Sequence, residues 1–192
     1  MLPTDGKKQP RIFGLTLSNN TSGDVMIFIY NCYAGTHSSS IAAAIHLGQI
    51  EGDRVPDSKR IQGINLFNRL DVKDMGRIIY RGTDEEGNRV YTLGRGSSRV
   101  VIPAMAELAG MMCEQHGLSE KIIFANMTHM VTPFMSVGGF ISRRLKLDFL
   151  GLPFLILGSK QAYLKIGSVV KMTREQAKSA EGPVIILENK QL

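Results

Sequence analysis

Residues 26–40 have the sequence MIFIYNCYAGTHSSS. The first five residues are apolar, and their β-branched and aromatic side chains predict a short buried strand. Residues 41–47 contain three alanines and a leucine, which favour a helix, and Gly48 is suited to end it. Ser38 or Ser39 would cap the amino end of this helix. The stretch therefore predicts a strand, a polar loop and a helix in succession.

The same alternation continues along the chain. Residues 77–80 and 89–93 flank the turn-forming segment Asp-Glu-Glu-Gly-Asn, which predicts a β-hairpin. The other predicted elements are helices at 64–70, at about 100–116 and from Thr132-Pro133 onward, and strands at 121–125, 152–157 and 184–187. Alternating strands and helices indicate a parallel sheet covered on both faces. We therefore expect an α/β fold with a three-layer, Rossmann-like, mostly parallel sheet and an antiparallel hairpin.

The first part of the chain differs in composition from the rest. Residues 1–24 are polar and contain two prolines and an Asn-Asn-Thr-Ser-Gly run, which is typical of a flexible tail. Residues 25–192 have the length and the apolar content of one domain with a full core. The expected organisation is a flexible tail at 1–24 followed by a single α/β domain.

Charge and cysteine content limit the classes of function. The 192-residue chain has a formal net charge of +6, but its basic residues are scattered and do not interleave with aromatic residues, so nucleic-acid binding is disfavoured. A basic chain also suits a phosphorylated small ligand. Two cysteines without a paired spacing, and no apolar leader or membrane-spanning segment, predict a cytoplasmic protein with no membrane partner. The oligomeric state is left open.

Three glycine-containing segments follow predicted strands. They are Gly35-Thr36-His37-Ser38-Ser39, Gly94-Arg95-Gly96-Ser97-Ser98 and Gly158-Ser159-Lys160. The carboxyl ends of parallel strands meet at one edge of a sheet, where ligands bind in open α/β folds. We therefore expect the three segments to converge on one site.

The first of these segments has the composition of an anion site. Glycine lets the backbone turn so that successive amides point inward, and the following helix adds free amides and its positive dipole end. In that field the thiol of Cys32 would have a lowered pKa and could act as a nucleophile. The candidate catalytic residues are Cys32, His37 and His129. The candidate anion-binding residues are Gly35, Thr36, Ser38, Ser39, Arg95, Ser97 and Ser98.

The segment from Cys32 to Ser39 resembles two known loops. It is similar to the phosphocysteine loop of sugar phosphotransferase IIB components and to the loop of low-molecular-weight tyrosine phosphatases and arsenate reductases. The resemblance implies strand–cysteine loop–helix geometry and phosphoryl chemistry at Cys32. The phosphatase pattern has an arginine where this chain has Ser38, and it has a late Asp-Pro acid that this chain lacks. Arg95 or another cation would have to replace that arginine.

A broader resemblance covers residues 26 to about 180. The segments IYNCYAGTHSS at 29–39 and YTLGRGSS at 91–98 resemble an uncharacterised bacterial domain-of-unknown-function family, DUF3189. The resemblance implies a cytoplasmic bacterial protein and supplies no activity.

These observations favour one function and leave alternatives. The chain is expected to bind a phosphorylated small molecule or nucleotide at the Cys32 loop, with Cys-dependent phosphoryl transfer or hydrolysis. The alternatives are a non-catalytic regulatory or ligand-sensing protein that uses the same pocket, and a scaffold without a small ligand. A nucleotide P-loop is disfavoured because the loop lacks the lysine and the second glycine of that motif. No cofactor and no metal are expected, since the cysteines and histidines have no paired ligand spacing.

Overall fold

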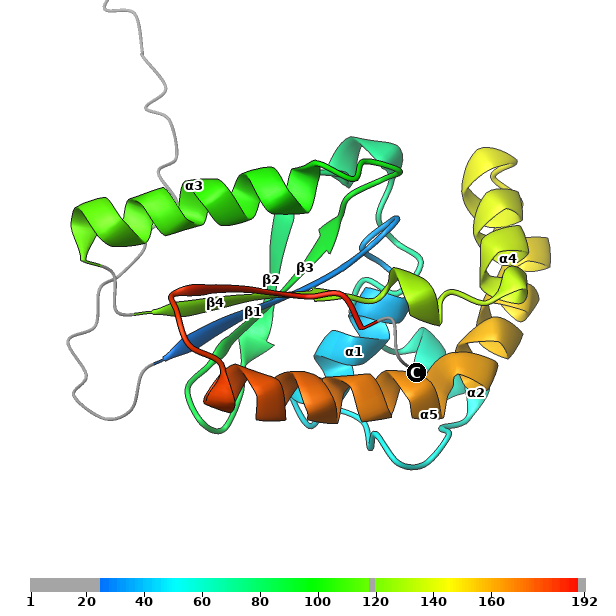
Figure 1. The fold of residues 1–192 in the computed structure, drawn as a ribbon. Coiled ribbons are helices and arrows are strands. Elements are labelled where there is room, and N and C mark those ends of the chain that lie inside the picture. Colours follow the sequence, from blue (N-terminus) through cyan, green and yellow to red (C-terminus); the bar gives the residue numbers. More distant parts are fainter. Residues whose placement is uncertain (1–24, 118–119, 190–192) are drawn as a thin grey trace, which may run out of the picture.

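The computed structural model describes residues 25–117 and 120–189, so the predicted tail at 1–24 lies outside the described residues. Its centre is a five-stranded sheet with the strand order β2-β3-β1-β4-β5 (Figure 1). The strands are β1 (Met26–Cys32), β2 (Ile78–Thr83), β3 (Arg89–Gly94), β4 (Lys121–Asn126) and β5 (Val184–Leu187).

The pairing of the strands confirms the predicted mixed sheet. Strand β1 pairs in parallel with both β3 and β4, and β4 pairs in parallel with β5. Strand β2 pairs antiparallel with β3 across the predicted hairpin turn, where Gly87 has a φ of 85°. In the register of β1, Cys32 lies beside Gly94 and Asn31 beside Asn126. The carboxyl ends of the three central strands therefore meet at one edge.

Helices cover both faces of this sheet, which confirms the predicted α/β fold and its layers. Helix α3 (Val101–His116) lies on one face, and helices α1 (Ser38–His46) and α5 (Asp148–Ser179) lie on the other (Figure 1). The side chains of β1 alternate between the layers: Phe28 and Tyr30 belong to the core under α1 and α5, whereas Ile29 belongs to the smaller core under α3. Because both faces of β1 are buried, its sequence begins with an unbroken run of apolar residues.

The remaining helices lie at the carboxyl edge and around α5. They are α2 (Ser58–Gln62), the 3-10 turns η1 (Val72–Asp74) and η2 (Thr128–Met130), and α4 (Pro133–Arg144). As predicted, α4 opens at Thr132-Pro133, and the hydroxyl of Thr132 accepts a hydrogen bond from the Met135 amide at 3.2 Å. The predicted stop at Gly48 is also confirmed, because this glycine follows α1 with a φ of 66°; α3 ends in the same way at Gly117, which has a φ of 62°.

The strand predicted at 152–157 is wrong, because these residues lie inside α5, a helix of 32 residues. A short unbroken apolar run fits a buried strand and a buried helix equally well. Only the longer spacing of buried positions separates them, since Gly151, Leu155, Gly158, Ala162 and Ile166 recur every three or four residues along one face. No helix within the described ranges has the combination of length and apolar character that crossing a membrane requires.

Three smaller predictions are also wrong. Gly158-Ser159-Lys160 is not a loop at the sheet edge, because it lies within α5. Residues 64–70 form turns in place of a helix, with positive φ at Leu66 and Asn68. Ser38 and Ser39 do not cap α1, since the helix begins at Ser38 and their hydroxyls bond elsewhere. The segment at 64–70 instead packs against the Cys32 loop.

Helices α4 and α5 pack at very short range. A methyl group on Gly138 of α4 would lie 2.7 Å from the carbonyl oxygen of Gly151 and 2.9 Å from the side chain of Leu155, both in α5. Glycine at this position therefore sets the distance between the two helices.

We expect the substitution Gly138→Ala to lower the free energy of unfolding by about 1–3 kcal/mol, because the added methyl group overpacks the contact. Gly110→Ala in α3 is the matched control, since a methyl group there meets nothing within 4 Å. It should raise stability by roughly 0.5–1 kcal/mol through helix propensity. Urea denaturation measures both, and equal effects of the two substitutions would contradict the close packing.

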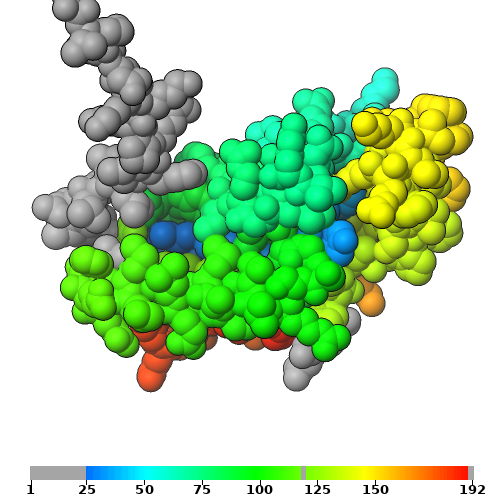
Figure 2. Space-filling model, turned by 90° about the horizontal axis from the view of Figure 1, so that it is seen from above, coloured from blue at the N-terminus to red at the C-terminus, as the bar shows by residue number. Residues whose placement is uncertain are grey.

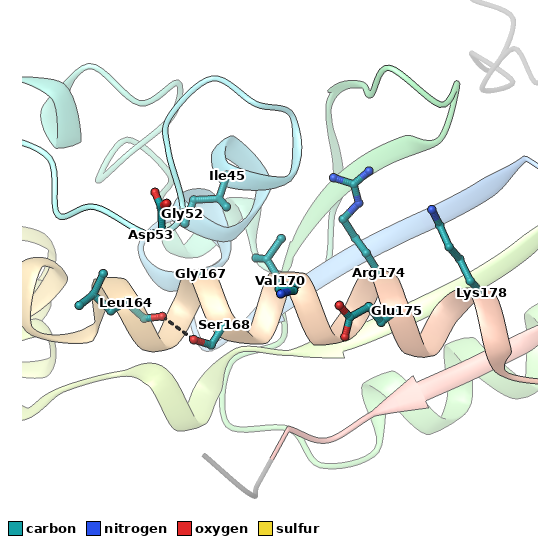
Figure 3. A pocket seen from close by; sticks show the side chains of 11 residues that line it. Ile45, Gly52, Asp53, Leu164, Gly167, Ser168, Val170, Arg174, Glu175 and Lys178 are labelled. Atoms are coloured by element: carbon teal, nitrogen blue, oxygen red, sulfur yellow. Dashed lines mark hydrogen bonds between the residues drawn. The ribbon is translucent and has the colours of Figure 1, made fainter.

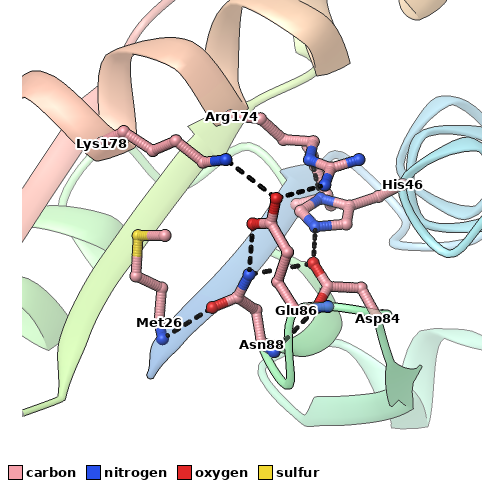
Figure 4. A network of polar contacts seen from close by, with 8 residues as sticks. Met26, His46, Asp84, Glu86, Asn88, Arg174 and Lys178 are labelled. Atoms are coloured by element: carbon pink, nitrogen blue, oxygen red, sulfur yellow. Dashed lines mark hydrogen bonds and ion pairs between the residues drawn. The ribbon is translucent and has the colours of Figure 1, made fainter. Parts of the chain in front are cut away.

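A buried polar network ties the hairpin to the helical layer at the other end of β1 (Figure 4). The hydroxyl of Tyr30 lies 2.7 Å from Nδ1 of His46, and Nε2 of His46 lies 3.0 Å from Oδ2 of Asp84. Glu86 in the same turn binds Arg174 and Lys178 of α5 at 3.4 and 2.8 Å. Strand β1, helix α1, the hairpin and α5 therefore share one set of hydrogen bonds.

His46 is neutral in this network. Burial lowers the pKa of His46 to about 4, although the hydrogen bond to Asp84 opposes the shift. The neutral ring accepts from Tyr30 at Nδ1 and donates to Asp84 from Nε2. Because the folded pKa lies below the ordinary value of 6.5, His46 contributes stability that is present above pH 6.5 and is lost as the pH falls toward 4.

We expect Tyr30→Phe to lower the free energy of unfolding by about 1–3 kcal/mol, because it leaves Nδ1 of His46 buried without a donor. The control is Tyr80→Phe, whose hydroxyl bonds Thr83 at an exposed position and whose loss should change stability by less than about 0.5 kcal/mol. Thermal or urea unfolding at neutral pH compares the two. A Tyr30→Phe protein as stable as the Tyr80→Phe protein would contradict the network.

Candidate functional site

The Cys32 loop lies at the topological switch point of the sheet. From β1 the chain continues to β2 and β3 on one side, and from β4 it continues to β5 on the other. Ligands of open α/β sheets bind where adjacent strands lead in opposite directions, outside their carboxyl ends. Here that position lies between the ends of β1 and β4 (Figure 1).

Backbone hydrogen bonds hold the loop against β3 and β4. The Cys32 and Tyr33 carbonyls accept from the amides of Arg95 and Gly96 at 3.0 and 2.8 Å. Gly35 has a φ of 72°, and a Cβ on it would lie 2.6 Å from the amide nitrogen of Gly94. Only glycine fits between the loop and β3, and this contact turns the loop back toward the end of β1.

The sulfur of Cys32 is the group toward which the loop turns. The amide of Gly35 donates to Sγ at 3.2 Å, and the hydroxyl of Ser39 lies 3.2 Å from Sγ. Burial by itself raises the pKa of Cys32, but hydrogen bonds from Ser39 and Gly35 outweigh it, so the pKa is lowered from its ordinary value. The hydroxyl of Ser38 donates to the carbonyl of Met127 at 3.1 Å. The loop therefore favours a buried thiolate.

Arg143 at the end of α4 supplies the positive charge of the site. Burial lowers the pKa of its guanidinium, and the negative charge of Cys32, followed by those of Asp71 and Tyr33, opposes this shift. The buried Nε of Arg143 has no hydrogen-bond partner among the described residues. A partly desolvated guanidinium near a thiolate, with an unused donor, is suited to bind an oxyanion.

His37 positions Arg143 and is neutral. Its Nε2 lies 3.1 Å from Oδ1 of Asn68, so this nitrogen carries the proton, and the guanidinium of Arg143 lies 3.3–3.5 Å from the two ring nitrogens. Burial, and then the charge of Arg143, lowers the pKa of His37 to about 3, against the opposing bond to Asn68. At neutral pH the ring is therefore not an imidazolium and does not act as a general acid in that form.

The turn at 64–70 fixes this arrangement from outside. Asn68 donates to Ser142 at 2.8 Å, and Ser142 in turn donates to Asp148 at the start of α5. Thr36 donates to the carbonyl of Leu66. The positive φ of Asn68, 54°, lets its side chain reach both His37 and Ser142. The imidazole is thus held by a chain of hydrogen bonds that runs from the loop to α5.

The site is closed in this conformation. Cys32 is 2% exposed, and Thr36, Ser38 and Ser39 are fully buried. Tyr33, at 54%, is the exposed part of the loop. Figure 2 views the molecule from the α3 side. The Cys32 loop, in blue, reaches the surface there between two regions, of which one is the turquoise segment around η1 and β2 and the other is the α4 end of the molecule. A ligand would reach Cys32 by displacing groups at this surface.

Two cavities lie away from the Cys32 loop. One, of about 660 Å³, lies between α5 and the segment at 52–53 and is lined by Arg174 and Lys178, together with apolar residues such as Ile45 and Val170 (Figure 3). The other, of about 480 Å³, is lined by residues 50–51 and 54–57 with Arg60 and Lys160. No residue of the loop lines either cavity.

The structure brings some of the predicted site residues together and separates others. Cys32, Gly35, Thr36, His37, Ser38 and Ser39 form one loop. Arg95 lies beside it, but its side chain bonds the hydroxyl of Thr128 at 3.2 Å. Ser97 and Ser98 follow in the next turn and make no hydrogen bond to the loop among the described residues. His129 is exposed on η2, and among the described residues it makes no hydrogen bond to Cys32 or His37.

Two residues of the site were not predicted from the sequence. Arg143 belongs to a small basic group with Arg144 and Lys146, and nothing in its spacing connects it to Cys32. Asn68 lies in a segment that was predicted to be helical. Both reach the site through tertiary packing alone.

Comparison with known proteins agrees with the broader sequence resemblance. A family model described as "protein of unknown function (DUF3189)" matches residues 27–175, which contain every residue of the site. No curated protein and no solved structure matches the chain significantly. The local resemblance to phosphotransferase and phosphatase loops stays a prediction.

Titration of the ultraviolet thiolate absorbance tests the state of Cys32. We expect a component with a pKa below the ordinary thiol value of 9.0, absent from a Cys32→Ser protein and retained in the control Cys113→Ser, which replaces the buried cysteine of α3. Because the folded pKa is lowered, the thiolate should stabilise the native protein fully above pH 9.0, and this contribution should disappear as the pH falls through the folded pKa. Two thiols that both titrate at or above 9.0 would contradict a stabilised thiolate.

Proposed function

The chain belongs to the DUF3189 family of unknown function, and from the geometry around Cys32 we propose that it binds the phosphoryl group of a phosphorylated small molecule or nucleotide. The observation that carries the proposal is a buried cysteine whose pKa is lowered by its own loop, together with the guanidinium of Arg143, which interacts with the charge of that cysteine and has a buried donor without a partner among the described residues. Anion-binding loops place amides in the same way at the start of a helix.

The proposed reaction is phosphoryl transfer through Cys32. The thiolate attacks phosphorus, the P–O bond to the leaving group breaks with its electron pair going to oxygen, and a phosphocysteine forms. Water or a second acceptor then takes the phosphoryl group and restores the thiolate. Arg143 would bind nonbridging oxygens and balance the charge that develops on them. In the phosphatase pattern this role belongs to the arginine that stands where this chain has Ser38.

The protonation state of His37 limits which leaving groups the site can serve. His37 is neutral and its one ring proton is committed to Asn68, so it holds Arg143 in place and does not protonate a leaving group. The proposal therefore favours donors whose leaving group departs as a stable anion, such as aryl or acyl phosphates. Both cysteines are free, and free thiols are typical of the reducing cytoplasm, so we propose a cytoplasmic location.

The closed loop favours a second candidate function. Because Thr36, Ser38 and Ser39 are fully buried, binding must involve opening of the site, and a protein that changes shape on binding can act as a sensor. In this alternative the same pocket binds a phosphorylated ligand without turnover. Thermal stabilisation by inorganic phosphate that depends on Arg143, without release of product, would support it.

The test combines turnover of para-nitrophenyl phosphate with the intact mass of acid-quenched protein. We expect Cys32→Ser to abolish both turnover and the added phosphoryl mass, and Arg143→Lys to lower turnover by roughly 10²–10³-fold, since it removes bidentate contacts in the transition state. Arg144→Lys, one residue further along α4 and exposed, is the matched control and should leave turnover unchanged.

The outcomes separate the two candidates. Turnover that survives Cys32→Ser would contradict covalent transfer. Absence of turnover, together with phosphate-induced stabilisation lost in Arg143→Lys, would favour the sensor. If the wild-type protein shows neither turnover nor stabilisation by phosphate, the anion site itself is wrong.

A further inference from the structure

The turn that joins α4 to α5 carries an unusual density of exposed apolar side chains. Phe149 is 72% exposed and Phe140 is 57% exposed, although large aromatic side chains normally lie inside a protein. The other exposed apolar residues of this tip are Val137, Leu145, Leu147 and Leu150. These six residues are here called the α4–α5 tip, and such a concentration of exposed apolar side chains in one segment is typical of a site of interaction.

The tip is a projection and not a groove. Helix α4 and the first turns of α5 stand at one end of the molecule, beyond the edge of the sheet (Figure 1). In the view from above, the yellow atoms of this region form the outer end of the protein (Figure 2). Both cavities lie elsewhere and include no residue of the tip. A convex apolar surface of this kind can insert into a fluid apolar layer, because such a layer adapts to its shape.

Basic residues outnumber acidic ones in the segment that contains the tip. From Val131 to Lys171 the chain has one acidic residue, Asp148, and six basic residues, which are Arg143, Arg144, Lys146, Lys160, Lys165 and Lys171. One carboxylate oxygen of Asp148 accepts a hydrogen bond from Ser142, and the basic residues outnumber this single negative charge. Arg144 and Lys146 are exposed beside the apolar side chains. The surface therefore complements a layer that is apolar inside and negatively charged outside.

We propose that the α4–α5 tip docks on an anionic lipid bilayer. Phe140, Phe149 and Leu150 would enter the boundary between headgroups and acyl chains, and Arg144 and Lys146 would contact lipid phosphates. The expectation of no membrane partner, which also disfavoured a membrane-surface role for residues 143–157, rested on the prediction that the apolar tract at 149–157 is a buried strand; the structure places this tract in α5, where Phe149 and Leu150 are exposed. The proposal is independent of the chemistry at Cys32.

A second copy of the chain fits the tip less well. Two tips packed against each other across a two-fold axis would bring Arg144 and Lys146 close to the same residues of the other copy. The single carboxylate of the tip, that of Asp148, already binds Ser142. Apolar burial would then be opposed by repulsion between like charges, whereas anionic lipid makes both contributions favourable.

Cosedimentation of the full-length protein with vesicles tests the proposal. We expect binding to an equimolar mixture of phosphatidylcholine and phosphatidylglycerol, weaker binding to phosphatidylcholine alone, and release as salt is raised. Phe140→Ser with Phe149→Ser should weaken binding at least about tenfold, because two aromatic side chains no longer leave water. Arg144→Gln with Lys146→Gln should remove the preference for anionic vesicles.

Matched controls come from α3, where Leu108 and Met111 are 58% and 55% exposed. The double substitution Leu108→Ser with Met111→Ser should leave vesicle binding unchanged. This control tests whether any exposed apolar surface of the protein is enough for vesicle binding. The proposal is overturned if the wild-type protein stays in the supernatant with anionic vesicles, or if the α3 variant loses binding as much as the tip variant. It is also overturned if sedimentation without lipid shows a dimer that the tip variant dissociates, because the tip would then bind a second copy.

Discussion

The contact between Gly35 and Gly94 is the constraint on which the candidate site depends. The two backbones lie so close that neither residue can carry a side chain, since a Cβ on Gly94 would lie 2.7 Å from the carbonyl of Ala34. This contact turns the chain at the end of β1 and directs the Gly35 amide at the Cys32 sulfur. The first turn of α1 then brings the hydroxyl of Ser39 to the same atom. That local geometry lowers the pKa of the buried Cys32 thiol.

The positive charge comes from a distant part of the chain. Helix α4 is held close to α5 by Gly138 and Gly151, and this packing directs Arg143 toward the loop. His37 of the loop, which is held by Asn68, contacts the guanidinium from one side. The candidate site and the α4–α5 tip therefore share one helix, because Arg143 is partly buried beside the loop while the adjacent Arg144 is exposed to solvent.

The sequence was sufficient for the five observed strands and for the succession of strand, loop and helix at Cys32, because these depend on local patterns. The apolar run of β1, the hairpin turn with Gly87, and the glycines after α1 and α3 each have a direct conformational reason. Residues 152–157 could not be assigned in the same way, since a nine-residue apolar run from Phe149 to Leu157 fits a strand as well as a helix. Arg143 could not be found either, because its role depends on how α4 packs and not on any spacing from Cys32.

The central claim is that the loop and Arg143 together form an anion site beside a thiolate. The most direct measurement is a crystal structure of the protein grown with tungstate, a stable mimic of the phosphoryl group. The account predicts a tungstate ion in contact with the loop amides and the guanidinium of Arg143, next to the Cys32 sulfur, with Tyr33 or Arg143 displaced from its present position. A structure from saturating tungstate in which Cys32 stays covered and the ion is absent from the loop would contradict it.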